Sequence, residues 1–398
     1  MLMAVLTVFL SFSSCKGATA PQGPAEIEIV LSAEQKAKRL MAEWIIEQKI
    51  GQMFFCAFTR KEVGRDITEM DEDIEKIVRN YHIGGVILFP ENIKSVSQVT
   101  NYIGGLQQAS EIPLFIGIDE EGGRITRTAK LGFPVMPSAL RIGQTGDAQN
   151  AYDAATTIAN YLTPLGFNVD FAPVADVFTN PSNTVIGDRA FSADPNVAGE
   201  MVKRFVEGLQ DHHVLSAVKH FPGHGDTGTD SHIGMATTEK TLAELSACEF
   251  IPFQAGIDAG ATFVMTGHIS TPRITGNDEP ASFSGFLLQD VLRDRLGFKG
   301  IVVTDALRMG AIAEYYSSGE SAVKAILAGV DMLLMPANLQ EAYNAVVAAV
   351  QSGIISKERI DDSVLRILTA KIKAGLVDLP DKQLDLEPYH AAYSSRSI

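Results

Sequence analysis

The stretch GIVVTD, residues 300–305, is a short apolar run that ends in an aspartate. Seven further runs of this kind recur along the chain. Each is largely apolar at successive positions, as expected for a parallel strand that is buried on both faces. The eight predicted strands cover residues 51–58, 85–89, 113–119, 169–174, 216–221, 262–268, 300–305 and 331–335.

Helical patterns lie between these runs. Examples cover residues 71–80, 96–109, 148–165, 197–212, 240–259 and 339–352. Strands that alternate with helices predict an α/β protein with a parallel sheet. A (β/α)8 TIM-type barrel and a doubly wound open sheet both satisfy this pattern. The count of eight strands favours the barrel, as do the polar residues at or just after most strand ends, where barrel enzymes place their chemistry.

The composition is that of a globular protein. The chain has 398 residues, of which 46% are hydrophobic and 20% are charged, which excludes a largely disordered chain. The net charge of −15 would repel phosphate backbones, so we expect no nucleic-acid partner. The three cysteines, Cys15, Cys56 and Cys248, are too few for a disulfide framework and too widely spaced for a CxxC-type zinc site.

The first residues resemble an export signal. Residues 2–12 (LMAVLTVFLSF) form an apolar run of signal-peptide length, and small residues precede Cys15, as in a bacterial lipobox. Phe12 departs from the usual leucine, and no Lys or Arg precedes the run. We expect a signal peptide over 1–15 with lipidation at Cys15, a flexible tether over 16–30, the barrel over 31–375 and a tail over 376–398. A plain signal peptide or a buried N-terminal strand are the alternatives.

This reading predicts an exported protein, either periplasmic or a membrane-anchored lipoprotein, that meets the membrane only through its lipid. No later segment reaches the 18 apolar residues of a membrane-spanning helix.

The stretch KHFPGHGDTGTDSH, residues 219–232, concentrates ionisable side chains after a predicted strand. The spacing of His220 and His224 would suit a zinc pair on a helix. Pro222 and Gly223 lie between them, so a helix is disfavoured there and we expect no metal. A polar surface loop is the other simple interpretation.

Asp230 and His232 stand two residues apart in this stretch. In extended backbone such residues point the same way, so the carboxylate of Asp230 can accept a hydrogen bond from the imidazole of His232. This contact would orient the ring and raise its proton affinity, which makes a proton donor and acceptor. No Gly-x-Ser-x-Gly elbow accompanies the pair, which argues against a serine hydrolase.

Three other strand ends carry charged residues. Asp305 ends its strand, where a helix N-cap is the simpler role. In IDEEGGRITR, Asp119 ends a strand and Arg124 and Arg127 follow a Gly-Gly turn, an arrangement that also suits a loop salt bridge. In VIGDRAFSADP, Arg189 follows the fourth strand, where it could be a surface arginine paired with a carboxylate.

Taken together, KHFPGHG followed by DSH, with DEEGGR, IGDRAFSADP and GIVVTDAL, resembles the N-terminal barrel of glycoside hydrolase family 3. It is most similar to the bacterial β-N-acetylglucosaminidases of that family. The similarity runs from about residue 51 to residue 336, with the motifs in the family's order. Two-domain β-glucosidases of the family take their acid/base from a second domain, which we do not expect here because the Asp230–His232 signature is present.

The resemblance implies a retaining exo-β-N-acetylglucosaminidase that needs no cofactor. Asp305 would be the nucleophile, and His232, oriented by Asp230, the general acid/base. Ala306 stands where some relatives carry a second aspartate, which leaves Asp305 as the strand-end carboxylate. Asp176 would either line the site or support the core. The residues implied to bind sugar hydroxyls are Asp119, Arg127, Arg189, Lys219 and His220.

Three rival functions stay open at this point. A β-glucosidase or xylosidase shares the fold but prefers sugars without an N-acetyl group. A β-N-acetylglucosaminide phosphorylase is the closer rival, because a neutral histidine does not repel phosphate as a carboxylate does. A non-catalytic glycan-binding lipoprotein is the third. The export signal and the family suggest peptidoglycan fragments as substrate. The sequence does not determine the oligomeric state.

Overall fold

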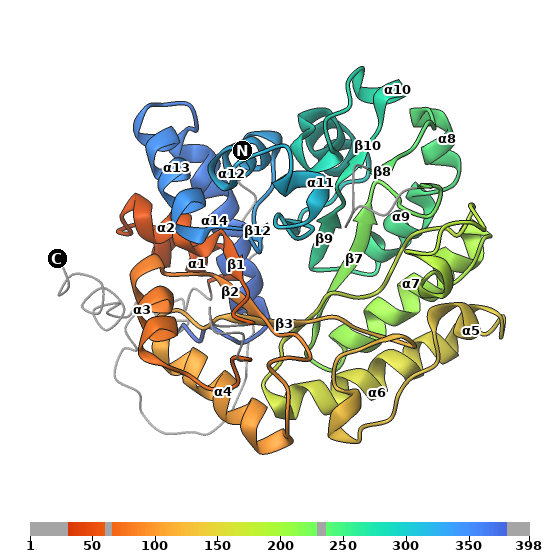
Figure 1. Ribbon diagram of the computed structural model, residues 1–398, viewed down its shortest axis with the longest axis horizontal. Helices are drawn as coiled ribbons and strands as arrows, with labels where there is room; N and C mark the ends of the chain where they lie inside the picture. Colours follow the sequence, from red (N-terminus) through yellow and green to blue (C-terminus); the bar gives the residue numbers. More distant parts are fainter. Residues whose placement is uncertain (1–30, 60–65, 229–235, 380–398) are drawn as a thin grey trace, which may run out of the picture.

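The structure is a computed structural model that describes residues 31–59, 66–228 and 236–379. Eight strands form one sheet in which every hydrogen-bonded pair is parallel and neighbours follow chain order. Figure 1 shows helices surrounding this sheet. The strands are β1 (Phe54–Cys56), β2 (Gly85–Ile87), β3 (Phe115–Ile118), β6 (Val169–Asp170), β7 (Leu215–Phe221), β9 (Phe263–Thr266), β11 (Ile301–Thr304) and β12 (Leu333–Leu334).

The sheet closes on itself between its two edge strands. A parallel bridge joins Val303 of β11 to Met332, next to β12, and the Thr304 N–H donates to the Met332 carbonyl at 3.1 Å. The protein is therefore a (β/α)8 barrel, and the alternative of an open doubly wound sheet is wrong. All eight predicted strands are present, each within or overlapping its predicted range.

Two further pairs of short strands extend beyond the barrel at the ends of its strands. They are antiparallel β4 (Glu120–Gly122) with β5 (Ile125–Thr126), and parallel β8 (Ala236–Thr237) with β10 (Ile269–Ser270). The helices are α1 (Ala33–Met41), α2 (Ile46–Gln52), α3 (Glu72–Tyr81), α4 (Val96–Ala109), α5 (Ala139–Gly143), α6 (Gln149–Leu165), α7 (Pro195–Gln210), α8 (Leu242–Ala247), α9 (Phe250–Asp258), α10 (Pro272–Thr275), α11 (Gly310–Ala313), α12 (Ser318–Ala328), α13 (Leu339–Gln351) and α14 (Lys357–Lys373), with the π-helix η4 (Phe286–Arg295) and 3-10 turns η1 (Ala129–Leu131), η2 (Gly187–Arg189) and η3 (Ala281–Phe283).

Several boundaries differ from the sequence prediction, and two of the differences have a clear physical reason. Gly51, expected to begin the first strand, lies in α2, where a Cβ would stand 2.0 Å from the Tyr81 carbonyl oxygen, so only glycine fits. The predicted helix over residues 240–259 is two helices, because the backbone at Cys248 leaves the helical region. Pro252 has no N–H to donate to the Cys248 carbonyl, which suits the first turn of a new helix and not the middle of a long one.

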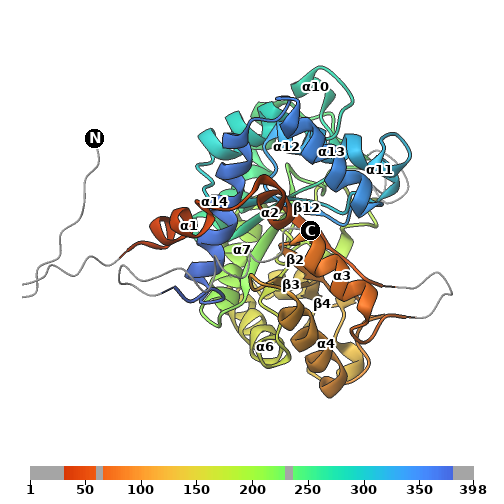
Figure 2. The same ribbon diagram turned by 90° about the vertical axis from the view of Figure 1, so that its left-hand side faces the viewer.

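Outer helices pack in neighbouring pairs around the barrel. Figure 2 shows α1 beside α14, which brings the start of the described chain against its end. The packed chain continues to Leu379, whose carbonyl accepts a hydrogen bond from the Lys36 ammonium at 2.9 Å. Among the described residues, no helix is long and apolar enough to cross a bilayer.

Aromatic rings fill the inside of the barrel. Phe55, Phe115, Phe171 and Phe263 contact one another edge to face or stacked, with ring centroids 5.2 to 6.5 Å apart. Gly117 lies among them, and a Cβ at this position would approach the Phe171 ring to 2.7 Å. The barrel is therefore a packed core and not a pore, and the rings form the floor beneath the mouth where the strands end.

A lysine lies beneath this aromatic layer. Lys371 of α14 is completely buried, donates to Gln52 Oε1 at 2.9 Å and stands 5.0 Å from the centroid of Phe115. Burial lowers the pKa of its ammonium to about 7. In the unfolded chain a lysine titrates near pH ~10.4. Between these values the unfolded chain binds the extra proton, so this group makes the fold less stable as the pH falls from about 10 to 7.

We therefore expect Lys371→Met to raise the midpoint of thermal unfolding at pH 6, because it removes a buried charge. The free energy of unfolding should increase by on the order of 1 kcal/mol or more. The gain should shrink at pH 9, where the native lysine is neutral. Thermal scans of the wild type and the variant from pH 6 to pH 9 give the difference between their unfolding midpoints. The effects of the other titrating groups cancel in this difference. A variant that is equally destabilised at both pH values would show that the Gln52 hydrogen bond outweighs the charge.

Candidate active site

A pocket of about 220 Å³ opens at the carboxyl ends of the barrel strands. It is smaller than the roughly 300–1,000 Å³ of sites for drug-sized ligands, which suits a single sugar unit. Its lining comes from residues in or after seven of the eight barrel strands. The lining residues are Ile87, Phe89, Asp119, Glu121, Ile125, Arg127, Arg189, Lys219, His220, Met265, Asp305, Ala306, Arg308, Met309, Leu334 and Met335.

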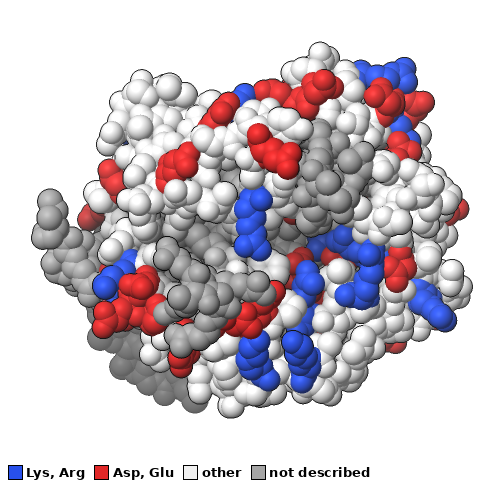
Figure 3. Space-filling model, viewed as in Figure 1, with Lys and Arg blue, Asp and Glu red and all other residues white. Residues whose placement is uncertain are grey.

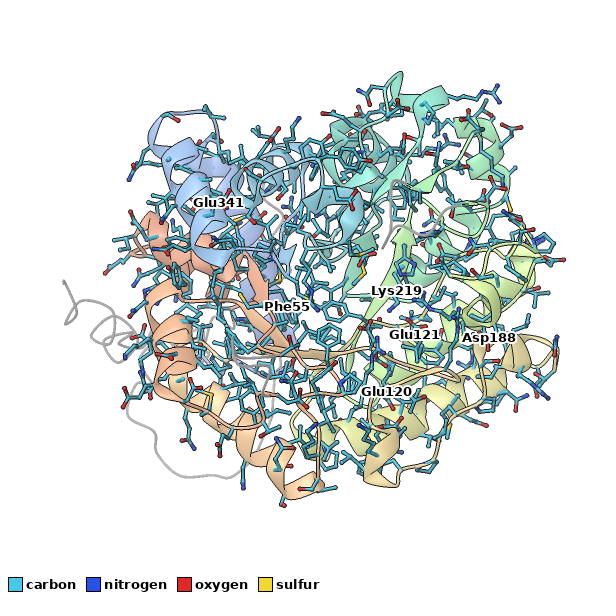
Figure 4. The ribbon with its side chains drawn as sticks, viewed as in Figure 1. Phe55, Glu120, Glu121, Asp188, Lys219 and Glu341 are labelled. Carbon is cyan, nitrogen blue, oxygen red and sulfur yellow. The ribbon has the colours of Figure 1, made fainter. Side chains whose placement is uncertain are left out.

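The inner part of the pocket is a buried network of charges around Glu121. Lys219 Nζ lies 2.6 Å from Glu121 Oε1 and 2.8 Å from Asp119 Oδ1. Arg189 donates through Nε and Nη2 to the two Glu121 oxygens, both at 2.8 Å. Figure 4 shows Lys219 and Glu121 close together, whereas Asp188 lies farther out. Three distant segments of the chain therefore meet at one carboxylate.

The opposite charges in this network keep both Glu121 and Lys219 ionised. Burial opposes ionisation of Glu121, but the charges of Arg189 and Lys219 outweigh it and hold the pKa of the carboxyl well below its usual range. Burial likewise opposes protonation of Lys219, and Asp119 and Glu121 raise the pKa of its ammonium above the ordinary value. The pocket therefore presents fixed charges near neutral pH, which suits charge-assisted hydrogen bonds to sugar hydroxyls.

Substitution of the central carboxylate tests this network. Glu121→Gln should destabilise the protein by about 3–5 kcal/mol, because it leaves Lys219 and Arg189 buried with less opposing charge. The ionised Glu121 carboxylate should stabilise the wild-type fold at neutral pH. This contribution should be lost as the pH falls below the ordinary titration range of glutamate, because the pKa of Glu121 is depressed in the folded state. Urea unfolding measures it, with Asp188→Asn as the control, since Asp188 pairs with Arg124 while both are half exposed. Equal stability of the two variants would contradict the prediction.

Asp119 and Arg127 line the pocket above this network. Arg127 Nη2 lies 3.6 Å from Asp119 Oδ2, and the Arg127 guanidinium lies 5.9 Å from the centroid of the Phe89 ring. The buried Nε of Arg127 has no hydrogen-bond acceptor among the described residues. A buried donor without an acceptor is costly, and a ligand oxygen in the pocket would satisfy it.

His220 enters the pocket beside Lys219. The register of β7 against β9 shifts between Lys219 and Phe221, and this irregularity allows two successive side chains to line the same pocket. His220 Nδ1 lies 2.8 Å from Asp176 Oδ2, which favours a proton on Nδ1 and leaves Nε2 as the acceptor. Asp176 is buried and also accepts from the backbone N–H of His224 at 2.6 Å. Asp176 therefore orients His220 and does not line the pocket.

Asp305 follows β11 directly. Its backbone N–H donates to the Thr266 carbonyl at 2.8 Å, and its Oδ1 accepts from the Ala306 N–H at 2.7 Å. These two backbone contacts hold the carboxylate at the pocket wall. Asp305 lines the same pocket as Asp119, Arg127, Arg189, Lys219 and His220, so the structure brings together six of the eight catalytic and sugar-binding residues implied by the sequence.

The other two, Asp230 and His232, lie outside the described residues, as does Cys15. The chain on either side of the Asp230–His232 stretch is well anchored. Thr238 donates to Asp226 Oδ2 at 3.1 Å, which links the residues before the stretch to those after it. Asn180 also donates to the Asp226 and Thr227 carbonyls.

Some residues have roles that the sequence did not indicate. Arg124 does not line the pocket but donates to the carbonyls of residues 184–186, which holds that loop in place. Glu121 was missed, although it stands two residues after Asp119 and so could be expected to point the same way. Among the described residues, no group of three or more His, Cys, Asp or Glu side chains is arranged to hold a metal ion.

The sequence profile of the glycosyl hydrolase family 3 N-terminal domain matches residues 45–370. The chain belongs to glycosyl hydrolase family 3. This confirms the resemblance that the motifs indicated. The beta-hexosaminidase A of Pseudoalteromonas piscicida is 32% identical over 92% of the chain, and the chain spans 64% of that relative's length.

Solved structures of family 3 members share the barrel. The β-N-acetylglucosaminidase of Paenibacillus sp. FPU-7 superposes with a TM-score of 0.80 at 37% identity, over 87% of this chain and 67% of that one. The beta-glucoside phosphorylase BglX superposes with a TM-score of 0.79 at 26% identity, over 90% of this chain and 64% of that one. Solved structures similar to this chain thus include one named for hydrolysis and one named for phosphorolysis.

Proposed function

We propose that the protein is a retaining exo-β-N-acetylglucosaminidase that removes terminal β-linked N-acetylglucosamine. The observation that carries the proposal is that Asp305 shares one small pocket with the charged groups around Glu121. A carboxylate at a strand end beside several fixed donors suits attack on a sugar held by its hydroxyls. The similarity to relatives named as β-hexosaminidase and β-N-acetylglucosaminidase supports the choice of sugar.

The pocket residues have separable tasks in this mechanism. Lys219, Arg127 and His220 bind the sugar, since each offers a polar atom to the pocket. Asp119 also binds it by accepting hydrogen bonds from the hydroxyl groups. Arg189 lines the pocket, and it holds Glu121 through both carboxylate oxygens. Asp305 attacks the anomeric carbon, and the bond to the leaving oxygen breaks as a covalent glycosyl-enzyme forms.

His232 would supply the protons. It protonates the leaving oxygen in the first step and removes a proton from water in the second, while Asp230 orients the ring and stabilises its charged form. The β-anomer of the sugar is released, with net retention of configuration.

Substrate preference and product stereochemistry test the proposal. Nitrophenyl β-N-acetylglucosaminide should be turned over at least about tenfold more efficiently than nitrophenyl β-glucoside, which a single lost polar contact in a dry site would explain. The first product seen by NMR should be β-N-acetylglucosamine. Preference for the glucoside or xyloside would instead assign the rival glycosidase function, and α-anomer release would exclude the covalent route.

A β-N-acetylglucosaminide phosphorylase is the second candidate, favoured by the structural similarity to a glycoside phosphorylase. In that reaction phosphate would attack the glycosyl-enzyme in place of water. Assays with and without phosphate, with product identification, separate the two: hydrolysis yields the free sugar at a phosphate-independent rate. A non-catalytic glycan-binding protein would bind the sugar without turnover, and Asp305 at the pocket wall argues against it.

We also propose that the protein is exported, that Cys15 carries a lipid and that peptidoglycan fragments are its substrate. The wild-type protein should fractionate with membranes, whereas Cys15→Ala should accumulate as uncleaved precursor or lose the anchor. Fractionation and the mass of the N-terminal peptide check this. Native protein found wholly in the aqueous fraction, with a mature N-terminus other than Cys15, would contradict it.

A further inference from the structure

Among the described residues that line the pocket, cations outnumber carboxylates by one. Its lining contains the three carboxylates Asp119, Glu121 and Asp305, together with four cations. Lys219 and Arg189 form ion pairs with the carboxylates of the inner network, and Arg127 is within 3.6 Å of Asp119. Arg308 is the fourth cation. Figure 3 shows Lys and Arg side chains beside the central hollow of this face, although the whole chain has a net charge of −15.

Arg308 is held at the wall of the pocket by its backbone and by a ring contact. Its backbone N–H donates to the Met335 carbonyl at 3.1 Å, and its guanidinium lies 5.7 Å from the centroid of the Phe89 ring. Within the part of the chain that the structure describes, no carboxylate lies within the 4.0 Å of a salt bridge from it. A cation–π contact of this kind uses none of the guanidinium N–H groups as hydrogen-bond donors, so they stay available to a ligand.

The position of Arg308 indicates which part of a substrate it would meet. Lys219 and Glu121 are buried at the inner end of the pocket, whereas Arg308 is exposed to solvent. An exo-acting enzyme holds the terminal sugar at the closed end, and the leaving group extends towards the opening. Arg308 follows Asp305 by three residues, so its guanidinium stands at the mouth close to the reacting carboxylate.

We propose that Arg308 is a specificity-determining residue of the leaving-group subsite, where its guanidinium binds an anion. This inference rests on the proposed glycosidase function. The preferred leaving group then carries a carboxylate, as an acidic sugar does, and the guanidinium matches its two oxygens in a bidentate pair. The same chemistry would also bind inorganic phosphate at the mouth, and the experiment distinguishes the two sources.

Matched substrates isolate the charge. The probes are carboxyphenyl β-N-acetylglucosaminides and their neutral methyl esters, with the substituent in the meta or para position. The ratio of kcat/KM for the acid to kcat/KM for the ester is measured for the wild type, Arg308→Gln and Arg308→Lys. Lys76→Gln is the control, because Lys76 is an exposed residue of α3 and its substitution changes the net charge equally.

We expect Arg308→Gln to lower the acid-to-ester ratio about tenfold, which corresponds to ~1.4 kcal/mol for a half-exposed bidentate pair. Arg308→Lys should retain part of the ratio, since it keeps the charge and loses the fork. Lys76→Gln should leave the ratio unchanged. Added salt should lower the wild-type ratio and not that of Arg308→Gln, because an exposed ion pair is screened.

The second arm uses inorganic phosphate with the neutral ester. If phosphate is the anion, glycosyl phosphate appears and Arg308→Gln raises the KM for phosphate, while the acid-to-ester ratio stays unaffected. An unchanged ratio together with no phosphate dependence would overturn the inference. If the wild type turns over neither substrate, the proposed function itself fails. Calorimetric titration with the carboxyphenyl glycoside and with phosphate then decides, since equal binding to wild type and Arg308→Gln would exclude an anion site.

Discussion

Asp305→Asn should reduce kcat/KM on any N-acetylglucosaminide by on the order of 1,000-fold or more, because the neutral amide of asparagine cannot form the glycosyl-enzyme. The fold should survive. The Asp305 N–H to Thr266 contact is made by the backbone, and the amide oxygen of asparagine can still accept from the Ala306 N–H. Steady-state kinetics, with circular dichroism and thermal melting, measure the two effects separately.

Two controls make this result specific to the nucleophile. Asp188→Asn removes a carboxylate of equal size outside the pocket and should retain full activity. Incubation with a 5-fluoro-N-acetylglucosaminyl fluoride, which keeps the 2-acetamido group and traps the intermediate, should add one sugar mass to the wild type and none to Asp305→Asn. Substantial residual activity in Asp305→Asn, or a trapped sugar on another residue, would assign the nucleophile elsewhere.

His232→Ala should lower kcat/KM on natural disaccharides by roughly 100-fold or more, as expected when a general acid is lost. A sugar alkoxide is a poor leaving group and needs the proton, whereas a dinitrophenolate leaves without it. The first step with a dinitrophenyl glycoside should therefore be much less affected. Deglycosylation then limits the rate, since water lacks its base, and the released phenolate should show a burst.

Azide provides the matched control for His232, because this anion attacks the glycosyl-enzyme without a base. It should accelerate turnover of the dinitrophenyl glycoside by His232→Ala and yield a glycosyl azide, with little effect on the wild type. Asp230→Asn should change in the same direction but less far, since Asp230 orients the ring and stabilises its charge. Equal losses on both substrate types, with neither burst nor rescue, would mean that His232 only shapes the pocket.

The sequence by itself determined the barrel and most of the pocket lining. Parallel strands buried on both faces leave apolar runs that can be counted, as at residues 113–119 and 300–305. The end of each run fixes where Asp119, Lys219 and Asp305 leave the sheet, and parallel strands bring such ends to one face. Local pattern therefore predicted which residues share the mouth of the barrel, and the structure places them in one pocket.

Only the tertiary structure decided how these residues are paired. Glu121 is ionised deep in the fold because Lys219 and Arg189, 98 and 68 positions along the chain, approach it within 2.8 Å or less. The contact that orients His220 through Asp176 and the contact of the Arg308 guanidinium with the Phe89 ring depend on the same kind of long-range distance. Strand periodicity specifies the face on which a side chain lies, whereas Coulomb energies depend on separations that only the closed barrel sets.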